Sequence, residues 1–447
     1  MAEGHLIPFY SLGKVPWAFS QAVYHALANL NHTCLISVSP SQRYVCIGRH
    51  QAAFQVIDLD YCRKENIPVM RRMVGGGAVL LDCEQVFFQA VFSKEIPAGS
   101  NLPLNLSYKE ELRKKFLGAA VEIHRRLGID AAAGGANDFV WRGKKISGTG
   151  FGEIGNSLVF VGNVILSFDY ETMSKCLKVD DEKARGKLYE GIKRNMATLK
   201  EIYQTWGYEL PGNETLSKSI REAFMAAFSP LFKEFSPSFA GFQVRTELPD
   251  FLISQIKKME DFLLKEEWLF EIDRKIASVP TCAASHTHNT DVENGNENGN
   301  ENTNEIAKEE NAKELSDFLS ALFISSASST KKPAVTHALS TGLNLTRIEL
   351  GAGKYCLFVK GKAGSSLFNV MVIRDSREII DLHIWGDFFS FKDSCEIENR
   401  LSGLRGCSIG EAKEILPEAA QQIADIVPAV DKHQLAELIA VACCEEG

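Results

Sequence analysis

The alternation of apolar and polar residues divides the first half of the chain into short extended segments and amphipathic helices. Apolar runs at residues 33–37, 45–48 and 86–92 predict strands, and residues 17–30 have an amphipathic helical pattern. Residues 108–127 predict a further helix, whose apolar face consists of Leu112, Phe116, Ala119, Ala120, Ile123 and Leu127. Strands that alternate with helices up to about residue 245 indicate one α/β domain.

The second half of the chain has a different pattern. Residues 345–387 predict three strands with turns at 352–353 and 361–365, and helices are expected at 395–401, 409–427 and 432–443, which together suit a small α+β domain. Residues 253–276 have a helical and then an extended pattern, and they form the predicted connection. Residues 286–310 are rich in Asn, Glu and Gly, so they cannot bury enough apolar surface to offset the entropy of ordering. The predicted units are therefore 1–245, a connecting segment 246–283, a low-complexity disordered insertion 284–312, and a C-terminal domain 313–447.

Residues 71–79 read Arg-Arg-Met-Val-Gly-Gly-Gly-Ala-Val and lie between two apolar extended runs, 67–70 and 78–81. Three consecutive glycines carry an entropic cost that an ordinary turn does not need, but they allow another group to approach the backbone closely. One interpretation is a flexible surface loop. The other, which we favour, is a ligand-facing corner that binds an anion with the help of the adjacent arginines. The glycine spacing fits neither the P-loop nor the dinucleotide-binding fingerprint.

A second glycine-rich stretch covers residues 134–150 and predicts two strands joined by a turn at Arg142 and Gly143. In such a hairpin, Asn137 and Asp138 on one strand face the region where Lys145 begins the next. A carboxylate and an amide opposite a lysine suit an acyl phosphate or a nucleotide. A surface hairpin with a solvated charge pair fits the same residues equally well.

Composition excludes several classes of protein. The chain has 447 residues, of which 45% are hydrophobic and 24% charged, and both values are ordinary for globular proteins. A net charge of −8 argues against a general nucleic-acid surface. No apolar run is long enough to span a bilayer, and the N-terminus lacks a signal sequence, so we expect a cytoplasmic protein without membrane contact. The eleven cysteines include no Cys-x-x-Cys pair, which suits reduced thiols.

The glycine corner and the hairpin, in this order, resemble the lipoate-protein ligase A family, within the biotin/lipoate ligase superfamily. In that family an Arg-Arg-x-x-Gly-Gly-Gly-Ala-Val run precedes an Asn-Asp segment and a Lys-Ile-Ser-Gly segment. Further similar segments are Ile-Gly-Arg-His-Gln at 47–51, the helix pattern at 17–30, Arg-Asn-Met-Ala-Thr-Leu at 194–199, and Ile-Trp-Gly-Asp at 384–387 with Leu-Ser-Gly at 401–403. The resemblance implies an α/β (α+β) fold, with a large catalytic domain of mixed sheets and a smaller C-terminal α+β accessory domain.

The resemblance also implies an activity. Lipoate would attack the α-phosphorus of ATP to give lipoyl-AMP and pyrophosphate, and a lysine of a lipoyl-carrier protein would then take the lipoyl group. Mg²⁺ is an expected cofactor, with Asp138 as a metal ligand, and Lys145 is the expected catalytic residue. The apolar acyl chain needs a slot, for which Val79, Leu80, Phe87 and Phe88 are candidates, although core packing is an equally good explanation of each. The implied lipoyl- and ATP-binding residues are Arg72, Gly75, Gly76, Gly77, Ala78, Asn137, Asp138 and Gly148, with Arg49 and Arg194 as further candidates.

The carrier expected from the resemblance is a glycine-cleavage H-like protein, an oxoacid dehydrogenase lipoyl domain, or a lipoate-binding protein of sulfur metabolism. Two departures from the family pattern keep alternatives open: Leu81-Asp82 stands where relatives have His-Asp, and residues 158–163 lack a common His-Gly-Thr. They indicate a subgroup with another acceptor, or a noncatalytic relative that binds adenylate or carrier. An octanoyl or lipoyl transferase that needs no ATP is another alternative, with Cys176 as a testable nucleophile. Biotin ligation fits the glycine run less well.

Overall fold

The computed structural model describes residues 5–94, 106–134, 138–179, 181–236, 238–277, 335–338, 343–351, 354–388, 390 and 394–444. The predicted insertion 284–312 lies outside these residues. Within them, no helix combines the length and the apolarity needed to cross a bilayer.

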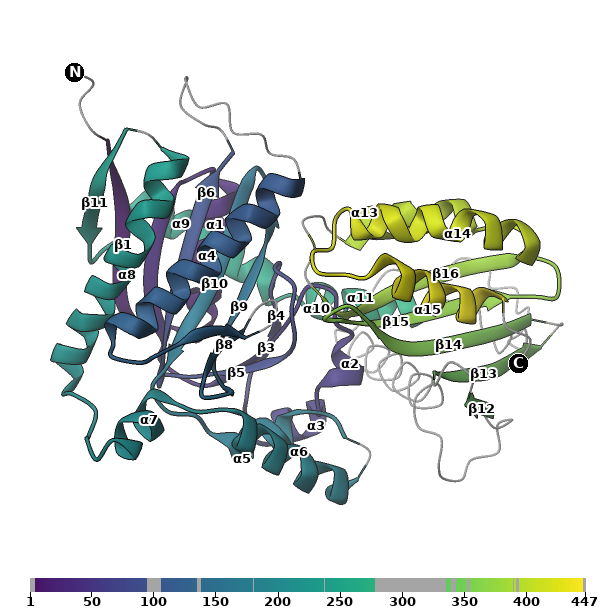
Figure 1. Cartoon of the computed structure of the whole chain (residues 1–447), viewed down its shortest axis with the longest axis horizontal. Helices are drawn as coiled ribbons and strands as arrows, with labels where there is room; N and C mark the ends of the chain where they lie inside the picture. Colours follow the sequence, from purple (N-terminus) through teal and green to yellow (C-terminus); the bar gives the residue numbers. More distant parts are fainter. Residues whose placement is uncertain are drawn as a thin grey trace, which may run out of the picture.

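The first part of the chain is built on an eight-stranded mixed sheet with the order β11-β1-β2-β6-β10-β9-β8-β7. The β11, β1 and β2 strands pair in parallel, and the pairs from β2 onward are antiparallel. A small sheet, β4-β3-β5, lies beside it (Figure 1). The strands are β1 His5–Val15, β2 Cys34–Pro40, β3 Tyr44–Ile47, β4 Val69–Arg71, β5 Val79–Leu81, β6 Gln85–Ser93, β7 Ala132–Gly134, β8 Asp138–Trp141, β9 Lys144–Ile154, β10 Ser157–Ile165 and β11 Phe239–Arg245.

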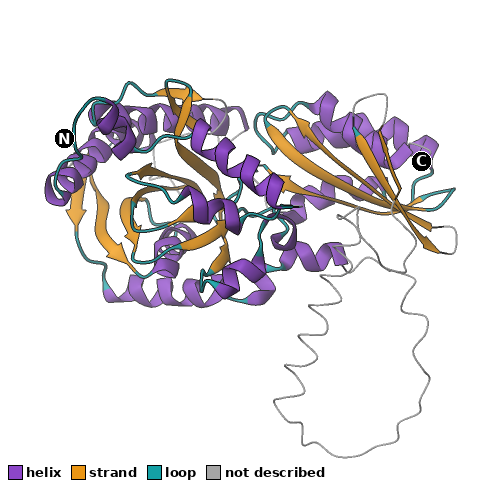
Figure 2. Cartoon of the chain, turned by 90° about the horizontal axis from the view of Figure 1, so that it is seen from below, coloured by secondary structure: helices purple, strands orange, loops and turns teal. Residues whose placement is uncertain are grey.

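Helices cover both faces of the large sheet, as Figure 2 shows, because its central strands carry apolar side chains on both faces. In β6, Phe88 and Phe92 pack on the side of α4 and α8, whereas Phe87 and Val91 pack on the side of α1 and α9. The helices are α1 Trp17–Asn29, α2 Ala53–Val56, α3 Leu59–Lys64, α4 Leu106–Arg126, α5 Tyr170–Cys176, α6 Glu182–Asn195, α7 Leu199–Thr205, α8 Asn213–Phe235, α9 Asp250–Leu263, α10 Glu266–Leu269 and α11 Glu271–Ala277.

The C-terminal part is an antiparallel five-stranded sheet, β12-β13-β14-β15-β16, with helices on one face. Its other face carries Phe358, Met371 and Trp385, which pack against Ala52 and against Ile276 of α11. The second domain is therefore docked on the first through α2 and α11. The elements are β12 Val335–Ala338, β13 Asn344–Gly351, β14 Lys354–Ala363, β15 Ser366–Arg374, β16 Ile379–Asp387, α13 Ser394–Leu401, the 3-10 turn Ser402–Leu404, α14 Ile409–Ala424 and α15 Lys432–Cys444.

The mixed α/β fold with a second C-terminal sheet confirms the predicted fold class. Two local predictions were wrong. The end of segment 253–276 is helical, not extended, because α10 and α11 follow α9 there. Residues 345–387 contain four strands, because a turn at 375–378 separates β15 from β16. That turn has neither Gly nor Pro, and instead the Asp375 side chain accepts hydrogen bonds from the backbone N–H groups of Arg377 and Glu378.

Candidate active site

The glycine corner connects β4 to β5 and is held by close backbone packing. Gly76 has a φ of +97°, which favours glycine. A Cβ atom on Gly48, at the end of β3, would lie 1.8 Å from the carbonyl oxygen of Gly76. The corner therefore fits against β3 only because both positions are glycine, so it is a fixed part of the core and not a flexible surface loop.

The two arginines before the glycines have different surroundings. The Arg72 guanidinium donates to the carbonyl oxygens of Gly75 at 2.8 Å, Gly77 at 2.9 Å and Cys46 at 3.1 Å, so it braces the corner. Arg71 is fully buried and donates to the carbonyl oxygens of Gln51 and Leu269, both at 2.6 Å. Burial lowers the pKa of Arg71 to about 10, against the opposing effect of Asp273. Arg71 thus ties the connecting helices to the small sheet, while Arg72 shapes the corner.

The hairpin of β8 and β9 carries Lys145, the predicted catalytic residue, and Asp138, a predicted ATP-binding residue and metal ligand. Its turn residues Arg142 and Gly143 have φ values of +49° and +78°, as a type I′ turn requires, so the predicted turn is confirmed. The Lys145 ammonium lies 2.8 Å from an Asp138 carboxylate oxygen. Both side chains are about two-fifths exposed, at 42% and 41%, so the pair adds about 1 kcal/mol or less to stability. Its importance is therefore the position that it gives to the ammonium group.

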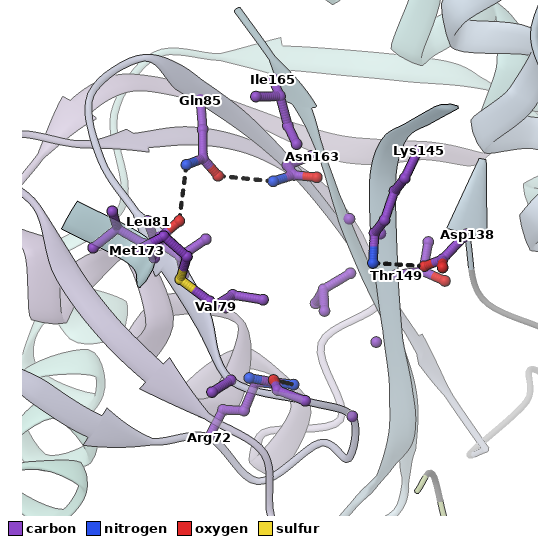
Figure 3. A pocket seen from close by; sticks show the side chains of 18 of the residues that line it. Arg72, Val79, Leu81, Gln85, Asp138, Lys145, Thr149, Asn163, Ile165 and Met173 are labelled. Atoms are coloured by element: carbon purple, nitrogen blue, oxygen red, sulfur yellow. Dashed lines mark hydrogen bonds and ion pairs between the residues drawn. The ribbon is translucent and has the colours of Figure 1, made fainter. Parts of the chain in front are cut away.

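One cavity of about 570 Å³ joins these elements. Figure 3 shows Lys145 and Asp138 on one wall and Arg72 on another. The predicted site residues that line the cavity are Arg72, Gly76, Gly77, Ala78, Asp138, Lys145 and Gly148. The glycine corner and the lysine, about seventy positions apart in the sequence, thus face a common space.

The other predicted site residues have different positions. Arg49 stacks on Trp268 at 4.6 Å and pairs with Glu271 at 2.6 Å, so it lies at the connecting helices. Arg194 is exposed, and neither it nor Arg49 lines the cavity. Gly75 contributes a carbonyl to Arg72 without lining the cavity. Asn137 lies outside the described residues.

The part of the cavity beyond Arg72 is apolar. Three of the four acyl-slot candidates, Val79, Leu80 and Phe87, line it, whereas Phe88 packs in the core against Phe116 and Phe224. The opposite wall of the cavity comes from α5, α6 and the segments that follow them, and no motif in the sequence predicted it. The amphipathic spacing of side chains on α6 predicts that one face of this helix is apolar. It does not predict which cavity that face covers. These missed apolar residues are Met173, Leu177, Leu188, Ile192 and Met196.

The positions at which this chain departs from the family pattern also face the cavity. Leu81 and Val161 are among its lining residues, and they make its wall more apolar than a histidine there would. Nearby, Gln85 donates to the carbonyl oxygen of Leu80 at 3.0 Å and accepts from the Asn163 amide at 2.8 Å. This amide pair supplies a polar edge to the slot (Figure 3).

Cys176 packs in a core cluster with Cys62 and Met173 and is fully buried. Interaction with Cys62 and burial both raise its pKa, which disfavours the thiolate needed for a nucleophile. No cysteine occurs among the described residues that line the cavity.

His25 of α1 supports the glycine corner from behind and was not singled out from the sequence. Its Nε2 accepts from the Met73 backbone N–H at 2.9 Å, and its Nδ1 lies 2.7 Å from the carbonyl oxygen of Gln21. The ring is therefore neutral, with the proton on Nδ1. Burial, and to a smaller extent Arg72, lowers the pKa of His25 from 6.5 to about 3.

Because His25 binds a proton more readily in the unfolded chain, it makes the protein less stable as pH falls from about 6.5 toward 3. The slope that His25 adds to the pH dependence of the free energy of unfolding approaches about 1.4 kcal/mol per pH unit within that window. We expect urea unfolding of His25→Gln to show a lower stability at pH 7 but a flatter pH dependence between pH 6 and pH 4. The exposed His433→Gln is the control and should keep the original dependence. An unchanged slope in His25→Gln would contradict this assignment.

The accessory domain also reaches the cavity, through Ser365, Ser366 and Asp387. A Cβ atom on Gly77 would lie 2.8 Å from an Asp387 carboxylate oxygen, so the carboxylate rests directly over the glycine corner. In the sequence, Asp387 falls in the predicted accessory domain and in no motif that indicates a role for it.

The described residues do not form a complete resident metal site. No group of three or more His, Cys, Asp or Glu side chains among them could hold a metal ion, and Lys145 already pairs with Asp138. Mg²⁺ commonly binds one or two carboxylates together with substrate phosphates. Magnesium as a cofactor, and Asp138 as its ligand, stay predictions.

Comparison with known proteins identifies the class of the large domain. Residues 13–228 match the family profile of the lipoyl protein ligase A/B catalytic domain. The glycine run and the hairpin, on which the family resemblance rests, both lie within this matched segment.

Individual relatives are more distant. The chain is 26% identical to lipoate–protein ligase 1 of Staphylococcus aureus over 158 residues. This aligned region covers 35% of this chain and 45% of the relative. It is 26% identical over 212 residues to lipoate-protein ligase A subunit 1 of Thermoplasma acidophilum, covering 45% of this chain and 77% of the relative. The chain thus spans about half the length of several curated relatives that it matches. The structure of P. falciparum LipL1 in complex with lipoate has the same fold, with a TM-score of 0.53 and 12% identity over 98% of this chain and all of that one.

Proposed function

We propose that this protein is an ATP-dependent lipoate–protein ligase. It would couple lipoate to the α-phosphorus of ATP, release pyrophosphate, and transfer the lipoyl group from lipoyl-AMP to a lysine of a carrier protein. The carrier would be an oxoacid dehydrogenase lipoyl domain, a glycine-cleavage H-like protein or a lipoate-binding protein of sulfur metabolism. The observation that carries the proposal is the single cavity in which an apolar slot meets a glycine corner and a lysine.

The residues of the cavity suit both chemical steps. The apolar wall from Val79 to Phe87 and from α5 and α6 can bury the hydrocarbon part of lipoate, and its carboxylate would then lie toward Lys145. Negative charge grows on the phosphate and acyl oxygens in each step, and a fixed ammonium group stabilises it without reorganisation. The backbone of Lys145 is itself held, because its carbonyl oxygen accepts from the Ala197 N–H at 2.9 Å. Gly148 leaves room beneath the ammonium, since a Cβ there would lie 3.4 Å from Nζ.

Two alternatives receive different support. A transferase that carries the acyl group on cysteine would need a reactive thiol in the cavity wall, and the described wall contains none. This favours activation by ATP. A noncatalytic relative is motivated by Leu81 and Val161, which replace polar groups on the wall. The retention of Lys145, Asp138 and the glycine corner in one cavity favours the enzyme.

The test measures the two steps separately. Lipoate-dependent exchange of pyrophosphate into ATP reports activation, and the mass of a lipoyl-carrier domain after incubation with magnesium–ATP and lipoate reports transfer. We expect exchange that depends on lipoate and a mass increase of one lipoyl group on the carrier. Octanoate and biotin in parallel reactions define acid specificity. A folded protein that shows neither exchange nor carrier modification with any of the three carriers would exclude the ligase.

A further inference from the structure

The cavity has a buried polar end, between β6 and α1, that the two chemical steps do not use. Gln89 follows Phe87 by two residues on β6, so both side chains lie on the same face of the strand, and both line the cavity. Gln89 is only 1% exposed. Gln21 and Tyr24 of α1 also line the cavity and are buried. Because β10 lies between β6 and β9, this polar end is separated from Lys145 by one strand.

The orientation of the Gln89 amide is fixed by α1. Its Nε2 donates to the carbonyl oxygen of Ser20 at 2.8 Å, and because a carbonyl oxygen can only accept, the amide cannot be turned the other way. The amide oxygen Oε1 is buried, and no group of the described residues donates a hydrogen bond to it. An unpaired buried acceptor is costly, so a donor is needed at this point of the cavity.

The hydroxyl and amide groups of α1 at this end bond to one another. The Tyr24 hydroxyl donates to Oε1 of Gln21 at 3.2 Å, and Nε2 of Gln21 donates to the Tyr44 hydroxyl at 2.8 Å. The Ser20 hydroxyl donates to the carbonyl oxygen of Trp17 at 2.6 Å, so Tyr44 is the donor in its 2.9 Å contact with Ser20. These protons are therefore already engaged, and a group that enters the cavity can supply the missing donor.

A neutral donor suits this end better than a cation. Burial raises the pKa of Tyr24 and of Tyr44, and the positive charge of Arg72 opposes the increase at both hydroxyls. That charge therefore acts on this end of the cavity, where a second cation would be repelled. The Arg72 guanidinium itself donates to backbone carbonyl oxygens. A hydroxyl, a thiol or an amide N–H of a ligand could pair with Gln89 without repulsion.

We propose that Gln89 recognises the far end of the acyl substrate, and that the preferred acid carries a neutral hydrogen-bond donor there. This inference rests on the proposed ligase function and specifies the acid. The dithiolane ring of lipoate has no hydrogen on sulfur, so it cannot donate. Its reduced form, dihydrolipoate, carries two thiols, which are weak donors. The cavity is thus better suited to dihydrolipoate, or to an acid with a distal hydroxyl, than to lipoate or octanoate.

The test compares acids that differ in the distal donor. Acid-dependent exchange of pyrophosphate into ATP by the full chain gives kcat/KM for 8-hydroxyoctanoate, octanoate and 8-methoxyoctanoate. Octanoate is smaller than the hydroxy acid and the methoxy acid is larger, and neither has a distal donor, so size alone cannot explain a preference. We expect the hydroxy acid to exceed both by about tenfold, because the other acids leave a buried acceptor unpaired. Dihydrolipoate should exceed lipoate by about two- to threefold, because a thiol donates weakly.

Gln89→Met removes the acceptor and keeps an unbranched side chain of similar length. We expect kcat/KM for the hydroxy acid to fall about tenfold in this variant, while that for octanoate stays within about threefold of the wild type. Gln204→Met, on the exposed surface of α7, is the control and should keep the preference.

Two results would overturn the assignment of Gln89. One is a wild-type protein that activates the hydroxy acid no better than the methoxy acid and octanoate. The other is a Gln89→Met variant that keeps the preference or loses activity equally toward all acids, as a merely structural role would require. Absence of activation of every acid by the wild type would instead refute the ligase function itself.

Discussion

Replacing Lys145 with alanine is expected to lower carrier lipoylation by a factor of about 100 to 1,000 while the protein stays folded. The factor is that of removing one fixed charge-stabilising donor from an active site. Stability should change little, because the ion pair with Asp138 is about two-fifths exposed on each side and contributes about 1 kcal/mol or less. The measurement is the initial rate of carrier modification by mass, together with urea unfolding of the same protein.

The matched control is Lys144→Ala, which removes the neighbouring and exposed lysine of the same hairpin. Because Lys144 does not line the cavity, its loss should leave turnover nearly unchanged. Near-normal turnover in Lys145→Ala, or an equal loss in both variants, would mean that the active site has been assigned to the wrong cavity.

Gly48→Ala is expected to damage both stability and activity. A Cβ at this position would lie 1.8 Å from the carbonyl oxygen of Gly76, and the obstacle is backbone, so no side-chain rotation relieves the clash. Either β3 or the glycine corner must move, and overpacking of this kind costs about 1–3 kcal/mol or more. Because the corner also forms a cavity wall, lipoylation should fall even at temperatures where the variant remains folded.

The control for this substitution is Gly118→Ala, in the exposed face of α4, where an added Cβ meets nothing within 4 Å. Alanine in a helix interior is favoured over glycine by about 0.5–1 kcal/mol, so this variant should be as stable as the wild type or slightly more stable. If Gly48→Ala kept wild-type unfolding and turnover, the close contact between β3 and the corner would not exist in solution.

The local elements were largely predictable from the sequence. Apolar periodicity located α4 and the central strands to within a few residues, because the 3.6- and 2-residue repeats follow from which faces are buried. The turn at Arg142 and Gly143 was predictable because its dihedral angles favour glycine. The turn at Asp375 was missed because a side chain, and not a glycine or proline, satisfies its backbone.

The site was predictable only in part. The motifs identified Lys145, Asp138 and the glycine corner, and the structure places them around one cavity. Arg49, a further candidate from the same family pattern, contacts Trp268 and Glu271 of the connecting helices and does not line the cavity. The apolar wall from α5 and α6 and the carboxylate of Asp387 carry no motif of their own. Their positions depend on how helices and a second domain pack against the first, which short-range patterns do not encode.

The sequence by itself determined the order of the strands and helices along the chain, the glycine corner and the charged hairpin, because these depend on neighbouring residues and on backbone geometry. Only the tertiary structure decided that the corner and the hairpin face one cavity, that Arg72 braces the corner while Arg71 holds the connecting helices, and that Asp387 crosses from the second domain. Each of these depends on contacts between residues distant in sequence, which form when apolar faces pack together and carry their polar side chains with them.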